Sequence, residues 1–180
     1  MSYLEAVPVM LVLVVAASIL WSTWRYGMSP MPSLGKARQA MLAQVTEPPR
    51  GDIVDMGSGW GTLAIPFARR FPHTRVVGYE VSWFPWAVSV LLARVLRLEN
   101  LHFYRQDFRQ ADLTGASVLL CYLMAQGMVR VSERLQQDPG AVERVVSHHF
   151  ALPGWQPSHT HYLADIYATP IYSYSVSNFT

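Results

Sequence analysis

The most constraining feature of this sequence is a glycine-rich segment, IVDMGSGWGTL, at residues 53–63. A short apolar run followed by closely spaced glycines is typical of a buried strand that ends in a tight turn before a helix. Gly57, Gly59 and Gly61 permit positive φ and let the backbone approach another group closely. We therefore expect a strand–loop–helix unit whose backbone amides face a ligand and favour its anionic groups.

The rest of the chain alternates between strand and helix patterns. Five apolar runs predict strands, at residues 52–56, 74–80, 101–107, 116–123 and 142–150. Three segments between them predict helices, at residues 62–70, 85–98 and 126–137. This alternation predicts an α/β fold with a doubly wound, mainly parallel sheet. Residues 161–176 add two β-rich segments separated by little more than residues 168–170, so we expect a seven-stranded sheet with a C-terminal antiparallel hairpin.

The N-terminal part of the chain is strongly apolar. Residues 6–24, AVPVMLVLVVAASILWSTW, contain no charged side chain. A helix of that length spans about 28 Å, close to the roughly 30 Å hydrocarbon core of a bilayer. Trp21, Trp24 and Tyr26 gather at its end, as interfacial anchors do. A cleaved signal peptide is one alternative, although only Glu5 and the chain terminus precede the run, and a buried core helix is another.

Basic residues after the apolar run predict its orientation. Arg25, Lys36 and Arg38 follow the run, which places the remaining chain on the cytoplasmic (or mitochondrial matrix) side of a membrane. The predicted localisation is therefore a membrane, with contact to the lipid bilayer through residues 6–24. The chain divides into a single-pass transmembrane anchor at residues 1–25, a linker with a short helix at 26–50, and a globular domain at 51–180.

Composition and charge exclude several classes of partner. The net charge is +2 and no run of Lys and Arg occurs, so we expect no nucleic acid. The single cysteine, Cys121, excludes an internal disulfide framework and a Cys-rich zinc site, and its simplest interpretation is a small buried apolar residue. We expect no metal site at His148, His149, His159 and His161, because neighbours in a strand point to opposite faces.

Glu80 indicates the class of ligand. It ends the second predicted strand, 19 residues after Gly61. A carboxylate at that place can accept hydrogen bonds from both hydroxyls of a ribose, which predicts a nucleoside-bearing cofactor. The alternative is a glycine-rich turn beside a solvated glutamate.

Two nucleoside cofactors compete for this site. A dinucleotide motif requires a small residue where this chain has Thr62, and its pyrophosphate would be repelled by Asp55. S-adenosylmethionine (SAM) reverses that preference, because Asp55 attracts its ammonium group while the loop amides meet its carboxylate. The spacing D-x-G-x-G-x-G, together with the terminal hairpin, favours SAM.

A further carboxylate follows the third predicted strand. Asp107 can accept from the exocyclic amine of adenine, with Phe108 alongside the ring; a helix N-cap is the alternative for Asp107. The predicted cofactor-binding residues are Asp55, Gly57, Ser58, Gly59, Gly61, Glu80, Asp107 and Phe108.

Three short motifs carry a family resemblance. DMGSGWG at 55–61, GYE at 78–80 and RQDF at 105–108 resemble motifs of class I, seven-stranded, SAM-dependent methyltransferases with a Rossmann-like fold. CYLMAQGM at 121–128 and FALPGWQP at 150–157, together with the N-terminal anchor, extend the likeness over almost the whole chain. The chain resembles the membrane-anchored lysine methyltransferases related to the one that modifies the c-subunit of ATP synthase.

The resemblance implies methyl transfer to a lysine of a membrane-associated protein. A lysine amine must first lose its proton, and a dry aromatic slot favours this by lowering its pKa. Tyr122 and Gln126 are the predicted catalytic residues of that slot, and Phe150 and Trp155 the predicted substrate contacts; each also fits a core or turn position. Methylation of a lipid-like small molecule and a catalytically silent SAM-binding module remain alternatives. The aromatic residues 83–86 fit either lipid contact or core packing.

Overall fold

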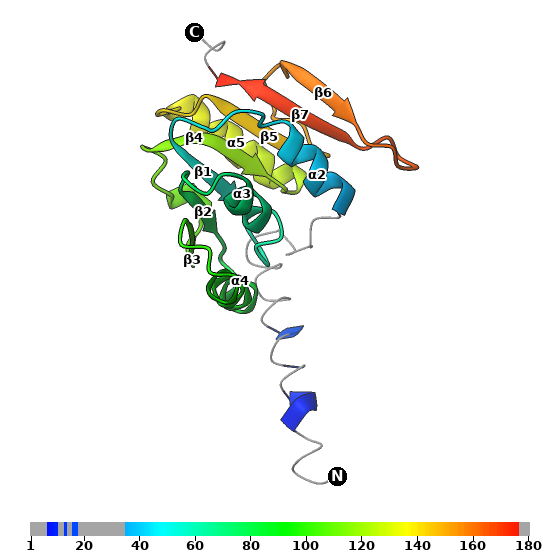
Figure 1. The fold of residues 1–180 in the computed structure, drawn as a ribbon. Helices are drawn as coiled ribbons and strands as arrows, with labels where there is room; N and C mark the ends of the chain where they lie inside the picture. Colours follow the sequence, from blue (N-terminus) through cyan, green and yellow to red (C-terminus); the bar gives the residue numbers. More distant parts are fainter. Residues whose placement is uncertain (1–6, 11–12, 14–15, 18–34, 177–180) are drawn as a thin grey trace.

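The computed structural model describes residues 7–10, 13, 16–17 and 35–176 of the chain (Figure 1). The helices in the range 35–176 are α2 (Gly35–Ala43), α3 (Ala64–Arg70), α4 (Trp83–Val95), η1 (Phe108–Gln110) and α5 (Ala125–Gln137). The strands are β1 (Asp52–Met56), β2 (Val76–Tyr79), β3 (Leu101–Tyr104), β4 (Ala116–Cys121), β5 (Arg144–His148), β6 (His159–Tyr162) and β7 (Pro170–Ser175).

The strands form one seven-stranded sheet in the order β3-β2-β1-β4-β5-β7-β6. Strands β1 to β5 pair in parallel, whereas β7 runs antiparallel to both β5 and β6. The predicted α/β fold, mainly parallel with a C-terminal antiparallel hairpin, is therefore confirmed. The strand order reverses at β1, because β2 lies on one side of it and β4 on the other.

The terminal hairpin has a longer connection than its sequence suggested. Strand β6 ends at Tyr162, whereas the β-rich pattern continues to residue 167. The carboxylate of Asp165 accepts hydrogen bonds from the backbone amides of Tyr167 and Thr169, and Ala168 has a φ of +46°. This local turn ends the strand even though the side chains between 163 and 167 favour extended structure.

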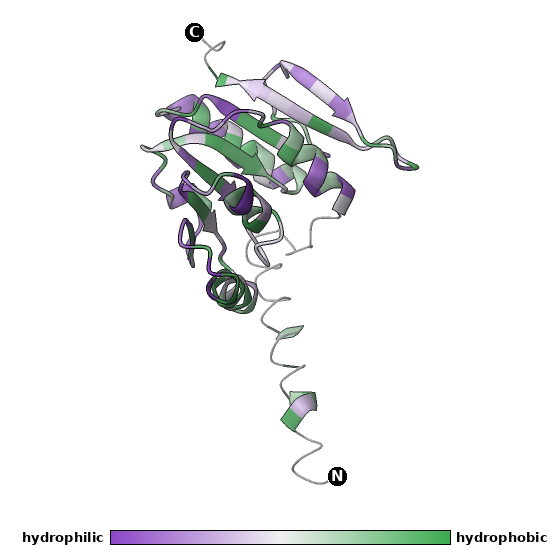
Figure 2. Cartoon of the chain, viewed as in Figure 1, coloured by the Kyte–Doolittle hydropathy of each residue, from purple (hydrophilic) through white to green (hydrophobic). Residues whose placement is uncertain are grey.

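Helices cover both faces of the sheet, and two apolar cores result. Met128, Val131 and Leu135 of α5 pack in one core with the buried strand residues of that face. Phe67 of α3 and Met41 of α2 pack in the other core, which α4 also covers. Figure 2 shows the hydrophobic central strands, and all six residues of β4 are buried, as expected for a strand covered twice. Cys121 is fully buried, as its interpretation as an apolar residue predicted.

Helix α2 belongs to this packed structure although it lies in the stretch that resembles a linker. Ala37 and Met41 are 1% and 0% exposed, and α2 packs against β5 and β7. Arg144 donates to the carbonyl of Gln44, and Ser173 donates to its side-chain oxygen, which fastens the end of α2 to the sheet.

Most of the predicted anchor, residues 6–24, lies outside the described residues. No helix in the part of the chain that the structure describes is long and apolar enough to cross a membrane. Residues 7–10 are helical, and Val7, Val9, Met10 and Leu13 each expose more than half of their surface.

Candidate active site

A cavity of about 190 Å³ opens at the carboxyl ends of the parallel strands. Ligands bind at this edge in doubly wound sheets, where the strand order reverses. The cavity is lined by Gly57, Gly59, Tyr79, Glu80, Val81, Gln106, Phe108, Tyr122, Leu123, Met124, His148, His149 and Phe150. These residues follow or end β1, β2, β3, β4 and β5 in turn, so all five parallel strands contribute to it.

The three glycines of the loop after β1 have different tasks. Gly57, Gly59 and Gly61 have φ of +106°, +51° and +74°, a region that disfavours other residues. Gly57 and Gly59 line the cavity, and a Cβ on Gly57 would lie 2.6 Å from a methyl group of Leu123. Gly61 does not line it; a Cβ there would lie 2.8 Å from the ring of Phe103. Two glycines thus leave room for a ligand, and the third leaves room for the protein core.

Below this loop lie buried polar atoms that the protein does not pair. Both carboxylate oxygens of Asp55 and the hydroxyl oxygen of Ser58 have no hydrogen-bond partner among the described residues. Asp55 is only 1% exposed and Ser58 5%. Burial, followed by the negative charge of Glu80, raises the pKa of Asp55 to about 7, and the backbone of Ala64 offsets this in part. Because such groups are costly when unpaired, this end of the site suits a cationic and hydrogen-bonding ligand.

Glu80 stands at the end of β2 and is 7% exposed. One carboxylate oxygen accepts from the Gly59 amide at 2.9 Å, and the other accepts from the Ser82 amide at 2.6 Å. These bonds tie the glycine loop to the start of α4. A carboxylate has about four acceptor positions, so both oxygens can still accept hydroxyl groups from the cavity side.

Asp107 lies beside the cavity rather than in its wall. It is the N-cap of η1 and accepts from the backbone amide and the guanidinium of Arg109. Burial alone would raise the pKa of Asp107, but the bonds from Arg109 hold it below its usual value. The helix-cap interpretation is therefore confirmed, while the predicted contact with adenine stays a prediction. Its neighbours Gln106 and Phe108 line the cavity, and Phe108 is 3% exposed.

The opposite end of the cavity is built from rings. The ring of Tyr122 stacks on that of His148, with centroids 4.3 Å apart and planes 17° apart, and His149 meets Phe150 edge-on at 4.6 Å. His148 and His149 line the same cavity, although strand neighbours normally point apart. The reason is that β5 ends at His148 and His149 has a φ of +67°, which turns the chain.

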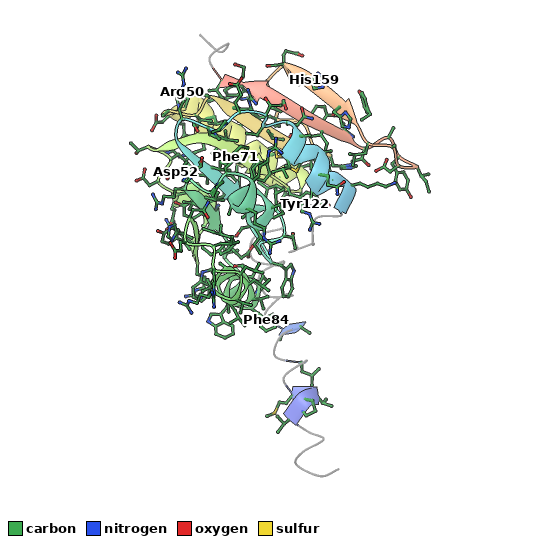
Figure 3. All side chains as sticks on the ribbon, in the orientation of Figure 1. Arg50, Asp52, Phe71, Phe84, Tyr122 and His159 are labelled. Carbon is green, nitrogen blue, oxygen red and sulfur yellow. The ribbon has the colours of Figure 1, made fainter. Side chains whose placement is uncertain are left out.

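His148 is neutral at physiological pH. Burial, and then the nearby His149, lower the pKa of His148 to about 4, while Asp165 acts weakly in the opposite direction. His159 and His161 lie on the edge strand β6, and Figure 3 labels His159 well apart from Tyr122. The described residues contain no group of three or more His, Cys, Asp or Glu side chains that could hold a metal ion.

The structure brings some predicted site residues together and leaves others outside. Gly57, Gly59, Glu80, Phe108, Tyr122 and Phe150 line the cavity, whereas Asp55, Ser58, Gly61 and Asp107 do not. Gln126 is exposed on the first turn of α5 and does not line it. Trp155 is 6% exposed in the core of the α5 face, where its ring nitrogen donates to Ser132 at 3.1 Å, so it does not reach the cavity either. The ring of Trp155 therefore packs in the core and does not contact the cavity.

Several cavity residues were not among the site residues predicted from the sequence. They are Tyr79, Val81, Gln106, Leu123, Met124, His148 and His149. Their shared signal is position: each lies at, or within three residues of, the end of a parallel strand. The four strands β2 to β5 end one to three residues before their predicted ends, so Tyr79, Gln106, Leu123, His148 and His149 were placed within strands.

Residues 55–159 match the family described as the ANTKMT methyltransferase domain, which covers more than half of the chain. The chain belongs to this family. The human ATP synthase c-subunit lysine N-methyltransferase is 31% identical over 114 residues, which are 61% of this chain and 47% of that protein. A protein-lysine N-methyltransferase of Saccharolobus islandicus is 26% identical over 71% of this chain and 79% of that protein.

The chain spans about half the length of the human relative that it matches. Among solved structures, an RNA methyltransferase of Salinibacter ruber in complex with S-adenosyl-L-homocysteine superposes with a TM-score of 0.70. The two chains are 23% identical, and the match covers 81% of this chain and 94% of the other. At that identity the likeness concerns the fold alone.

Proposed function

We propose that this chain is a SAM-dependent protein-lysine N-methyltransferase held at a membrane. The observation that carries the proposal is the contrast within one cavity. One end has a glycine loop above Asp55 and Ser58, which have no side-chain hydrogen-bond partner among the described residues, and the other is a cluster of aromatic and imidazole rings. The membership of the family and the lysine methyltransferases among its relatives support the same chemistry.

The residues of the polar end fit SAM group by group. Gly57 and Gly59 would let the methionyl end approach the loop closely, while their amides keep their bonds to the Asp55 carbonyl and to Glu80. Asp55, beneath the loop, would offset the charge of the methionyl ammonium. Glu80 accepts from the ribose hydroxyls while it keeps its bonds to the Gly59 and Ser82 amides. When bound, SAM supplies a methyl group on a sulfonium centre, which an uncharged amine can accept in an in-line displacement. NAD fits poorly, because its pyrophosphate would face the buried Asp55.

The residues of the aromatic end fit the acceptor. An ammonium group entering this end loses water and meets neutral rings, which lowers its pKa and favours the free amine. Tyr122, His148 and Phe150 form its walls, and none carries a charge at neutral pH given the low pKa of His148. Their main contribution is to orient the amine and to exclude water.

The membrane part of the proposal rests on the N-terminal sequence. Residues 6–24 contain no charge, and basic residues follow them, which places the domain on the cytoplasmic or matrix side. The acceptor is then a lysine of a protein close to the same membrane. Extraction of membranes with alkaline carbonate tests the anchor: the full chain should remain in the pellet, whereas release into the supernatant contradicts it.

The function is tested in two stages on the full chain in detergent. Calorimetric titration should show micromolar binding of SAM and of S-adenosylhomocysteine and none of NAD; the reverse pattern overturns the cofactor. Incubation with membranes and methyl-labelled SAM should then place the label in methyl-lysine of a protein hydrolysate. Label in the organic extract indicates a lipid-like acceptor, and SAM binding without any transfer indicates a silent SAM-binding module.

A further inference from the structure

Helix α4 has an apolar face that the rest of the domain does not cover. Its sequence, WFPWAVSVLLARV, contains a single charged residue, Arg94. Trp83, Leu91 and Val95 are 57%, 58% and 67% exposed. At about 100° per residue these three positions lie within one arc of roughly 120°, so they form a continuous strip. Figure 2, which views α4 along its axis, shows most of its ribbon in the hydrophobic colours.

The opposite side of α4 already has its packing partner. Pro85, Ser89 and Ala93 are buried against the sheet. The ring nitrogen of Trp86 donates to the carbonyl of Phe103 at 3.1 Å, so this tryptophan is fixed in the core. The aromatic residues 83–86 therefore divide into a core member, Trp86, and an exposed member, Trp83. A solvated helix would place polar residues where the exposed strip lies.

Arginines lie within the strip and around it. Arg94 lies on the same arc, between the positions of Trp83 and Leu91, and is exposed. Arg97 is exposed just beyond the end of the helix, in a groove that Glu99 also lines. A second groove, between α2, α3 and α4, is walled by apolar side chains that include Leu42, Trp60, Ile65, Pro66 and Leu92. Arg38, Arg69 and Arg70 also line this second groove, and no acidic residue does.

This pattern identifies the partner by its chemistry. We propose that α4 docks on an anionic phospholipid bilayer, with Trp83, Leu91 and Val95 in the headgroup region. Exposed apolar residues bordered by cations are the features by which interfacial helices bind such membranes, and tryptophan favours that interface. A second copy of this chain is a poor occupant, because a two-fold interface here would bring the same arginines against each other.

Docking through α4 also orients the cavity. Val81 lines the cavity and lies two residues before Trp83, and Glu80 is bonded to the Ser82 amide between them. A helix held on the membrane therefore keeps the cavity mouth near the lipid surface, where the acceptor lysine is proposed to be. The docking itself requires neither methyl transfer nor a transmembrane anchor.

A single label tests the docking in the full chain. Cys121 is the one cysteine and is fully buried, so an introduced cysteine can be labelled selectively. The Leu91→Cys variant is labelled with an environment-sensitive fluorophore. It is then mixed with phosphatidylcholine–phosphatidylserine vesicles that contain nitroxide-labelled lipid. We expect a blue shift and strong quenching at residue 91. The matched control is Glu133→Cys, exposed on α5 over the other face of the sheet, and it should show neither.

Three results overturn the proposal. Absence of quenching at residue 91, or equal quenching at residue 133, means that α4 does not face lipid. A blue shift at residue 91 without quenching by the lipid nitroxide means that a protein, either a partner or a second copy, covers α4. The contribution of charge is tested separately. The double substitution Arg94→Glu and Arg97→Glu, in the chain labelled at residue 91, should reduce quenching about fivefold or more on anionic vesicles. Equal quenching of this variant and the parent contradicts the role of the arginines.

Discussion

The two ends of the cavity differ in how the protein treats charge. At the β1–β2 end, Asp55 is buried beneath the glycine loop with no hydrogen-bond partner for its carboxylate among the described residues, and burial together with the nearby Glu80 raises the pKa of Asp55. At the β4–β5 end, Tyr122 and His148 stack as neutral rings. At the first end the buried carboxylate costs free energy, and a ligand with a positive charge reduces that cost. The second end needs no ligand to satisfy its groups, and it acts on the acceptor through its shape and by excluding water.

This difference teaches which changes should affect which partner. Substitutions at the first end should weaken SAM binding, and substitutions at the second should alter the acceptor while leaving SAM in place. The following variants test that separation.

The largest effect is expected at Gly57. Gly57→Ala forces a side chain into a φ of +106° and within 2.6 Å of Leu123. We expect a loss of about 2–3 kcal/mol in unfolding free energy and SAM affinity about a hundredfold lower. Gly154→Ala is the control, because Gly154 also has a positive φ, +79°, but lies outside the cavity. It should lose stability and keep its SAM affinity. Denaturant unfolding and calorimetry measure the two quantities, and equal SAM loss in both variants would contradict a specific role of the loop.

Asp55→Asn should have opposite effects on stability and on binding. The folded pKa of about 7 exceeds the ordinary value of 3.8, so the parent loses stability as pH rises from about 4 to 7. At pH 8 the variant should be more stable by about 2–4 kcal/mol, and its SAM affinity should be at least about tenfold lower. Asp52→Asn, whose carboxylate meets Arg75 on the surface at 3.1 Å, should change stability by less than about 1 kcal/mol. Lower stability of Asp55→Asn at pH 8 would show that the carboxylate is paired after all.

Glu80→Gln tests the ribose contact. Glutamine retains one acceptor for the Gly59 or Ser82 amide but loses the charge that strengthens bonds from hydroxyl groups. SAM affinity should fall about tenfold with the fold intact, as judged by calorimetry and circular dichroism. Glu99→Gln, on the surface after α4, serves as control. An unchanged dissociation constant in Glu80→Gln refutes the ribose role.

His148→Phe should separate the acceptor from the cofactor. The ring stack on Tyr122 is kept, so SAM affinity should change less than about twofold, while KM for the lysine acceptor should change by about fivefold. The low pKa of His148 also predicts that the parent loses stability as pH falls from 6.5 towards about 4. At pH 5 the variant should therefore be more stable by about 1 kcal/mol in unfolding free energy. A weaker SAM complex in this variant would break the proposed division of the cavity.

The smallest effect is expected at Trp155. Trp155→Phe removes the bond to Ser132 and leaves a small gap in the core, which should cost about 1–2 kcal/mol of stability. SAM affinity and KM for the acceptor should both stay within about twofold of the parent values. If KM rises tenfold instead, Trp155 contributes to substrate binding, as the family resemblance implied, in addition to core packing.

The sequence predicted the fold and, at the polar end of the cavity, the positions of Gly57, Gly59 and Glu80. Both depend on local patterns: a strand and helix periodicity for the sheet, and a glycine spacing with Glu80 at a strand end for the loop. It predicted the aromatic end less well. Tyr122 and Phe150 were found, but Gln126 and Trp155 lie outside the cavity, and His148 and His149 were assigned to opposite sides of a strand. Strand β5 ends at His148, two residues before its predicted end, and the positive φ of His149 lets both rings line the cavity.

The sequence by itself therefore determined the features that depend on residues close together in the chain. Only glycine adopts the backbone of residues 57, 59 and 61 at low cost, and only a strand run followed by that loop fits the pattern. The tertiary structure alone decided that Gly61 makes room for Phe103, that Asp55 has no partner among the described residues, and that Trp83 and Trp86 face opposite surroundings. The physical reason is that burial and pairing are set by neighbours distant in the chain, whose approach local preferences do not encode.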